Sequence, residues 1–134
     1  MKSNWLIGIA AVGLLQASTG SLAGDLPLWT SDRGLFTVSY VSSIDPITIN
    51  RIHEWVLHIE TADGAAVDSA VLSVAGGMPE HDHGLPTRPR VTENLGNGDY
   101  RVKGLRFHMA GEWLLEIIID DGERTDSVAI ALSL

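Results

Sequence analysis

The chain has 134 residues, with 17 acidic against nine basic side chains, a formal net charge of −8 and no cysteine. This charge balance argues against nucleic acid as a partner, because phosphate binding needs clustered positive charge. Without cysteine the fold cannot use disulfides, and any bound metal must be held by histidine, methionine or carboxylate ligands.

The first residues have the layout of a secretory signal peptide. Lys2 is followed by an apolar run over residues 5–15, and small residues end at Ala23. A charged start, a short apolar middle and small residues at the cleavage site are typical of such peptides. The run is shorter than the roughly 20 apolar residues of a spanning helix, so we expect cleavage after residue 23, with an uncleaved anchor as the alternative. The mature protein would then be periplasmic or secreted, with no stable membrane span.

Residues 24–33 predict an irregular lead-in, and stretches of alternating apolar and polar residues follow it. Apolar residues occupy every second position in seven stretches: 36–40, 55–59, 70–74, 100–102, 105–109, 113–119 and 128–134. This period of two is typical of half-buried β-strands. Turn-forming sequences separate the stretches, and two of them, Asn97-Gly98 and Asp121-Gly122, suit two-residue hairpins.

About seven short strands at regular spacing predict a single domain, residues 24–134, with an immunoglobulin-like antiparallel β-sandwich fold. A small barrel is the alternative architecture. Trp55 and Trp113 are expected in the core, where large rings contribute strongly to burial. Tyr100 is expected to form a corner hydrogen bond. Gly104 shifts the phase of the alternation, which predicts a bulge or bend at that point.

Methionine and histidine gather in two segments of this chain. Met78, His81 and His83 lie in the stretch GGMPEHDHGLPTRPR, and His108 and Met109 are adjacent in FHMAGEW. In an extended segment, His81 and His83 point to the same side because side chains alternate between faces. Thioether sulfur suits Cu(I), and imidazole binds both oxidation states of copper. We therefore predict a Cu(I) site with Met78, His81, His83 and Met109 as ligands and His108 as the reserve ligand.

Other interpretations of these residues stay open. A His-x-His loop with acidic neighbours is often only polar surface, and methionine is often core filler. His53 is expected on the core side of a strand near its end, and His58 on the opposite face, both in structural roles. No nucleophile motif such as G-x-S-x-G is present, so we do not expect an enzyme.

The stretch from residue 46 to residue 134 resembles the YtkA-like domain, which is related to the periplasmic part of FixH-type proteins. The resemblance rests on the pattern GGMPxHxHGLPTxP followed by GxYxVxGLxFxMxGxW. It implies an exported β-sandwich with a link to copper, since FixH-type proteins accompany copper delivery to a terminal oxidase. The positions that match are Met78, His81, His83 and Met109.

Two functions from different classes follow from these observations. The first is an exported, periplasmic metal-binding protein that carries or buffers copper for a copper-receiving or envelope protein. The alternative is a structural or protein-interaction module of the cell envelope that binds no metal, with the histidine stretch as a rigid recognition loop. Exposed sheet edges would let such a module recruit extended partners.

Overall fold

The computed structural model describes residues 26–134. The predicted signal peptide and the first residues of the lead-in therefore lie outside the described residues. Within the described part the chain forms nine β-strands and no helix, so it contains no helix that could cross a membrane. The strands are β1 (Trp29–Thr30), β2 (Phe36–Ser42), β3 (His53–Thr61), β4 (Val71–Met78), β5 (His83–Gly84), β6 (Arg90–Gly96), β7 (Asp99–Leu105), β8 (Glu112–Asp120) and β9 (Thr125–Ser133).

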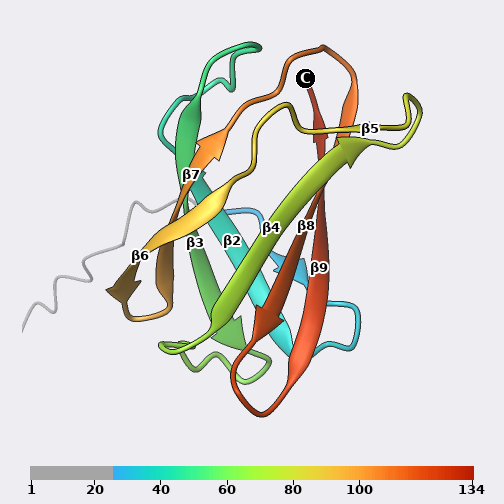
Figure 1. Cartoon of the computed structure of the whole chain (residues 1–134). Helices are drawn as coiled ribbons and strands as arrows, with labels where there is room; N and C mark the ends of the chain where they lie inside the picture. Colours follow the sequence, from blue (N-terminus) through green and yellow to red (C-terminus); the bar gives the residue numbers. More distant parts are fainter. Residues whose placement is uncertain (1–25) are drawn as a thin grey trace, which may run out of the picture.

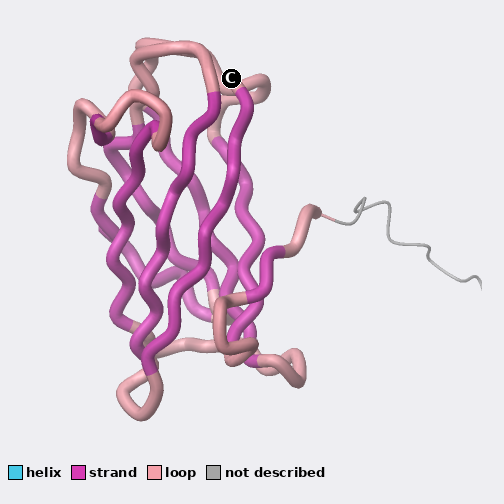
Figure 2. Tube along the Cα trace, turned by 90° about the vertical axis from the view of Figure 1, so that its right-hand side faces the viewer, coloured by secondary structure: helices cyan, strands magenta, loops and turns pink. Residues whose placement is uncertain are grey.

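The strands form two antiparallel sheets that pack face to face (Figure 1). One sheet has the order β1-β2-β3-β7-β6 and the other has the order β5-β4-β8-β9. Figure 2 shows the strands running between two sets of loops, one at each end of the sandwich. The predicted all-β sandwich is thus confirmed, and the barrel alternative is wrong because the two sheets stay separate.

The strand count differs from the prediction of about seven, for three physical reasons. Strands β1 and β5 have only two residues each, too few for a period to show, and β1 lies within the predicted lead-in. Strand β6 is an edge strand whose residues are mostly exposed, so it has no apolar alternation. Residues 106–109 were predicted as part of a strand, but they form a loop that buries Phe107 without pairing in a sheet.

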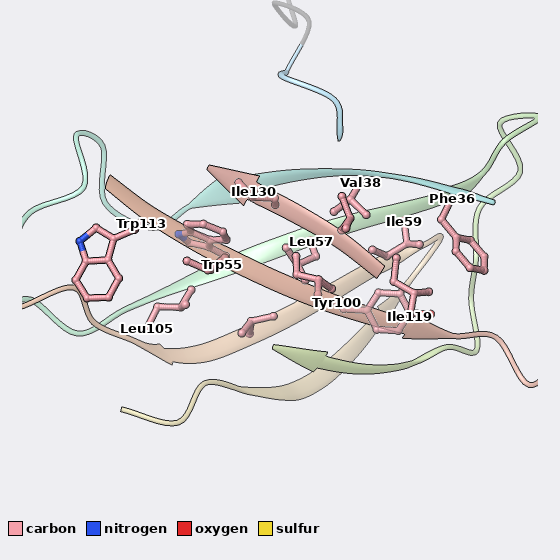
Figure 3. Packing of buried hydrophobic residues seen from close by; sticks show 14 of the residues in the cluster. Phe36, Val38, Trp55, Leu57, Ile59, Tyr100, Leu105, Trp113, Ile119 and Ile130 are labelled. Carbon is pink, nitrogen blue, oxygen red and sulfur yellow. The ribbon is translucent and has the colours of Figure 1, made fainter. Parts of the chain in front are cut away.

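The core lies between the inward faces of the two sheets. Strand β8 alternates buried and exposed residues along its whole length, as the sequence predicts. Trp55 and Trp113 are each about 1% exposed, so their predicted core positions are confirmed. Figure 3 shows side chains from both sheets pointing toward one another, with Trp113 at one end of the row. Burying a large apolar side chain contributes about 1.5–3 kcal/mol, and with no cysteine in the chain this burial holds the sheets together.

The predictions for the β6–β7 hairpin and for the bulge at Gly104 are confirmed, and the prediction of a two-residue β8–β9 turn is wrong. Asn97 and Gly98 link β6 to β7 with φ angles of 54° and 80°, as a two-residue hairpin requires. Gly104, with φ of 87°, is the extra residue where the register of β7 against β3 shifts, which confirms the bulge. The β8–β9 connection, however, has four residues, because the Asp121 carboxylate accepts hydrogen bonds from the backbone amides of Glu123 and Arg124.

Tyr100 forms the predicted corner. Its hydroxyl donates to the Val67 carbonyl and accepts a hydrogen bond of 2.9 Å from the Ala70 amide. The ring is about 1% exposed, so both backbone groups depend on this one hydroxyl. The corner therefore fastens the segment before β4 to the opposite sheet.

Replacing Tyr100 with phenylalanine should lower the free energy of unfolding by about 1–3 kcal/mol, because it leaves the buried Val67 carbonyl and the partly buried Ala70 amide unpaired. Urea denaturation would measure the loss. Tyr40→Phe is the matched control, since the Tyr40 hydroxyl bonds to none of the residues described here, and its effect should stay within about 0.5 kcal/mol. Equal losses in the two variants would contradict the corner's role.

Candidate functional site

The β4–β5 hairpin positions the first two histidines. Met78 at the end of β4 pairs with His83 in β5, and the His81 amide donates to the Met78 carbonyl at 3.1 Å. The strands approach closely because the sequence has glycine here: a Cβ on Gly77 would lie 2.9 Å from the His83 carbonyl oxygen. Gly77 is therefore what lets His83 lie against β4.

The loop over residues 106–111 positions the third histidine at the same end of the sandwich (Figure 1). Its start is held by the Asn50 amide, which donates to the Phe107 carbonyl at 2.7 Å. Its end is held by a pair of backbone hydrogen bonds between Gly111 and Leu134. Between these points, the Trp113 indole donates to the Met109 carbonyl at 3.0 Å. The loop is thus fixed from both sides and from the core beneath it.

The two loops bring three imidazole rings into one row. The centroids of His81 and His83 are 5.8 Å apart, and those of His83 and His108 are 5.0 Å apart. Two imidazoles bound to one ion at about 2.1 Å would have their centroids roughly 5–6 Å apart, so either pair has a suitable spacing. The Nδ1 atom of His108 is buried and has no hydrogen-bond partner among the described residues.

The two predicted methionine ligands lie in different environments. Met78 is only 2% exposed, and its side chain shares a face with that of His83, because directly paired residues of antiparallel strands point the same way. Its terminal methyl lies 2.7 Å from where a Cβ on Gly111 would be, so it packs beneath the second loop. Met109 is 36% exposed beside His108. Met78 is therefore packed under the 106–111 loop, whereas Met109 is partly open to solvent.

Within residues 26–134, no three side chains of histidine, cysteine, aspartate or glutamate are arranged to share one metal ion. His83 lies between His81 and His108, and each neighbouring ring contacts it from a different direction. An ion held here would thus combine no more than two imidazoles with thioether sulfur. That ligand set is softer than one of three histidines.

Sequence reasoning ranked His108 behind Met109, but His108 is the residue whose ring meets His83. Adjacent residues on a strand point to opposite faces, and that rule gave the ranking. The segment is a loop, so the rule does not apply to it. Sequence reasoning also missed the part played by Trp113, whose ring lies edge-on to His108 at 5.4 Å and 6.4 Å from His83. A tryptophan five positions after a histidine carries no signal for this contact.

His53 and His58 do not join the row, as predicted. His53 is 6% exposed and packs between Trp55 and Phe107. His58 lies on the outer face, where its two ring nitrogens bond to Asp99 at 2.6 Å and Glu60 at 3.1 Å. Burial lowers the pKa of His58, but the hydrogen bonds to the two carboxylates outweigh it and leave the pKa raised above its ordinary value. Both residues therefore have structural partners of their own.

A surface hollow of about 440 Å³ lies against the β4–β5 hairpin. Met78, Pro79, Asp82 and His83 line one side of it, and residues of β4 and β8 form its floor. The hairpin thus borders both this hollow and the 106–111 loop.

A sequence model of the YtkA-like family matches residues 37–117, from β2 into β8. The match includes both loops and all five predicted ligand positions. The chain belongs to the YtkA-like family.

Among solved structures, this YtkA-like chain is similar to the ZirS C-terminal domain, with 15% sequence identity and a TM-score of 0.43, over 100% of this chain and 85% of that one. Comparison with curated protein sequences gives no significant match.

The packing of Met78 against Gly111 generates a prediction about the loop. Gly111→Ala should reduce the free energy of unfolding by about 1–3 kcal/mol and shift the methyl NMR signal of Met78, because the new Cβ overlaps that methyl. Gly122→Ala is the control, since Gly122 also has positive φ but no atom within 4 Å of its Cβ position. Backbone strain alone would give the two variants the same loss and leave the Met78 signal in place.

Proposed function

We propose that this YtkA-like protein is an exported metal-binding protein that carries or buffers copper as cargo. The observation that supports it most is the 5.0 Å approach of the His83 and His108 rings, which come from two loops 25 positions apart in the chain. The match to the YtkA-like family covers both the β4–β5 hairpin and the 106–111 loop. Export rests on the signal-peptide pattern of residues 1–23.

The donor chemistry supports Cu(I) over other ions. Two imidazoles with one or two thioethers form a soft, neutral ligand set that offers little to magnesium or calcium. Zinc prefers four ligands drawn from histidine, cysteine and carboxylate, and no such group of even three is arranged within the described residues. The ligands proposed are His81, His83, Met78 and Met109. His108 is the reserve ligand, since its ring centroid lies 5.0 Å from that of His83.

The arrangement suits a carrier in particular. The His81 and His83 side chains are exposed at the end of the sandwich, so a partner can reach an ion that they hold. The fold around them is fixed by backbone hydrogen bonds and by core packing, which lowers the ordering cost of binding. The expected partner is a copper-receiving or envelope protein.

Purified protein should bind close to one equivalent of Cu(I), and the double variant His81→Ala, His83→Ala should lose this binding. A competition titration with a chromogenic Cu(I) chelator would measure both. His58→Ala is the control, because His58 lies on the outer face with its own carboxylate partners. Unchanged copper affinity in the double variant would refute the proposal and favour a protein-interaction module.

The thioethers should determine which metal is preferred. Met78→Leu with Met109→Leu keeps the side-chain volume nearly constant, and should weaken Cu(I) binding by about tenfold or more while changing Zn(II) binding little. Parallel competition titrations with the two metals would measure the change in selectivity. An equal loss for both metals would mean that the methionines act only through packing.

A further inference from the structure

The lysine and arginine side chains of this acidic protein are concentrated at one place. Six of the nine occur at Arg51, Arg88, Arg90, Arg101, Lys103 and Arg106. Gly104 is the point where their segments meet. Arg90 pairs with Lys103 across β6 and β7, and the carbonyl oxygen of Arg88 lies 3.6 Å from where a Cβ on Gly104 would be.

The third segment joins the same place from β3. His53 pairs with Leu105 immediately after the bulge, which brings Arg51 to the end of β7. The Arg106 guanidinium donates to the side-chain oxygen of Asn50 at 3.1 Å. We define the basic corner as Arg51, Arg88, Arg90, Lys103 and Arg106.

Most of this positive charge is not neutralised. Arg101, just outside the corner, bonds to both Glu54 and Glu93. Lys103 lies 3.9 Å from Glu54, at the limit of an ion pair. The four arginines of the basic corner have no carboxylate within 4 Å among residues 26–134. In a chain of net charge −8, this is a local excess of positive charge.

Apolar surface and a hollow accompany the charge. Ile52 is 65% exposed and Ile49 is 37% exposed, and both belong to the loop that precedes β3. A hollow of about 280 Å³ is lined by Ile52, Lys103 and Gly104 together with Ser43, His53 and Glu54. Arginine beside exposed apolar side chains is the composition that protein interfaces favour.

We propose that the basic corner is a docking surface for an acidic segment of a partner protein. Charge complementarity supports this occupant, because unpaired arginines bind carboxylates through charge-assisted, bidentate hydrogen bonds. An anionic membrane fits less well. Glu80 and Asp82 are exposed in the turn between β4 and β5. This hairpin lies at the same end of the sandwich as the corner (Figure 1), so a flat membrane surface would meet their negative charge as well, whereas a short segment contacts the corner alone.

The proposal does not depend on copper. The corner lies at the end of the sandwich that also holds the histidine row, since Arg106 is two residues before His108. A partner docked there would therefore sit next to the β4–β5 hairpin. If that hairpin carries copper, the corner selects the protein to which the ion passes.

The test uses a fluorescein-labelled peptide of alternating aspartate and glutamate, with binding measured by fluorescence anisotropy. The intact protein should bind the peptide and release it as salt is added, because exposed charge pairs are screened. The double variant Arg88→Glu, Arg90→Glu should bind at least about tenfold more weakly. Both side chains are exposed, so the fold should survive, and the urea unfolding midpoint checks this.

The matched control is Arg33→Glu with Arg124→Glu, which makes the same change in net charge near the β8–β9 turn. Its affinity for the peptide should change by about twofold or less. The variant His81→Ala, His83→Ala should bind the peptide as the intact protein does, whether or not it binds copper. Equal losses in the two charge variants would overturn the proposal. So would binding to phosphatidylglycerol vesicles without binding to the peptide.

Discussion

Trp113 joins the hydrophobic core to the row of histidines, and the candidate site depends on this side chain. Its ring lies edge-on to Phe107 at 5.2 Å on the core side and edge-on to His108 at 5.4 Å on the rim side. The indole nitrogen donates to the Met109 carbonyl, so the same side chain also fixes the loop backbone. Because Trp113 is about 1% exposed and packed on all sides, the loop cannot shift without disturbing the core. The position of His108 is therefore set by sandwich packing.

The hairpin that carries His81 and His83 depends on a different constraint, which is close backbone approach. Gly77 allows β5 to lie against β4, because a Cβ there would lie 2.9 Å from the His83 carbonyl oxygen, and Gly76 lets β4 approach the Leu114 carbonyl of β8 closely. The hairpin and the 106–111 loop then reach the same end of the molecule from opposite sheets. The loop before β3 reaches that end as well and brings Arg51 of the basic corner, and its Asn50 accepts a hydrogen bond from Arg106 (Figure 1). One end of the sandwich thus combines soft ligands, unpaired positive charge and exposed apolar side chains.

The strands that could be predicted from the sequence are those in which buried and exposed side chains alternate residue by residue. The alternation in β3 and β8 predicts both strands and their inward faces, because every second side chain must avoid water. The corner hydrogen bond of Tyr100 and the Asn97-Gly98 turn were also predictable, since each depends on a few adjacent residues. Edge strand β6 was not, because backbone pairing with β7 holds it in place while its side chains stay in solvent. Residues 106–109 were wrongly predicted to continue a strand. Leu105 and Phe107 keep the buried alternation, but the chain leaves the sheet after Leu105.

The sequence by itself determined the inventory of the candidate site: two methionines and three histidines in two short segments, with no cysteine to compete for an ion. It also determined the class of fold, because the apolar period is local information. Only the tertiary structure decided that His108 meets His83, that Met78 is buried beneath them, and that arginines from three segments gather around Gly104. These contacts join residues far apart in the chain. Their geometry is set by how the two sheets pack and where the loops leave them, which no local pattern of residues encodes.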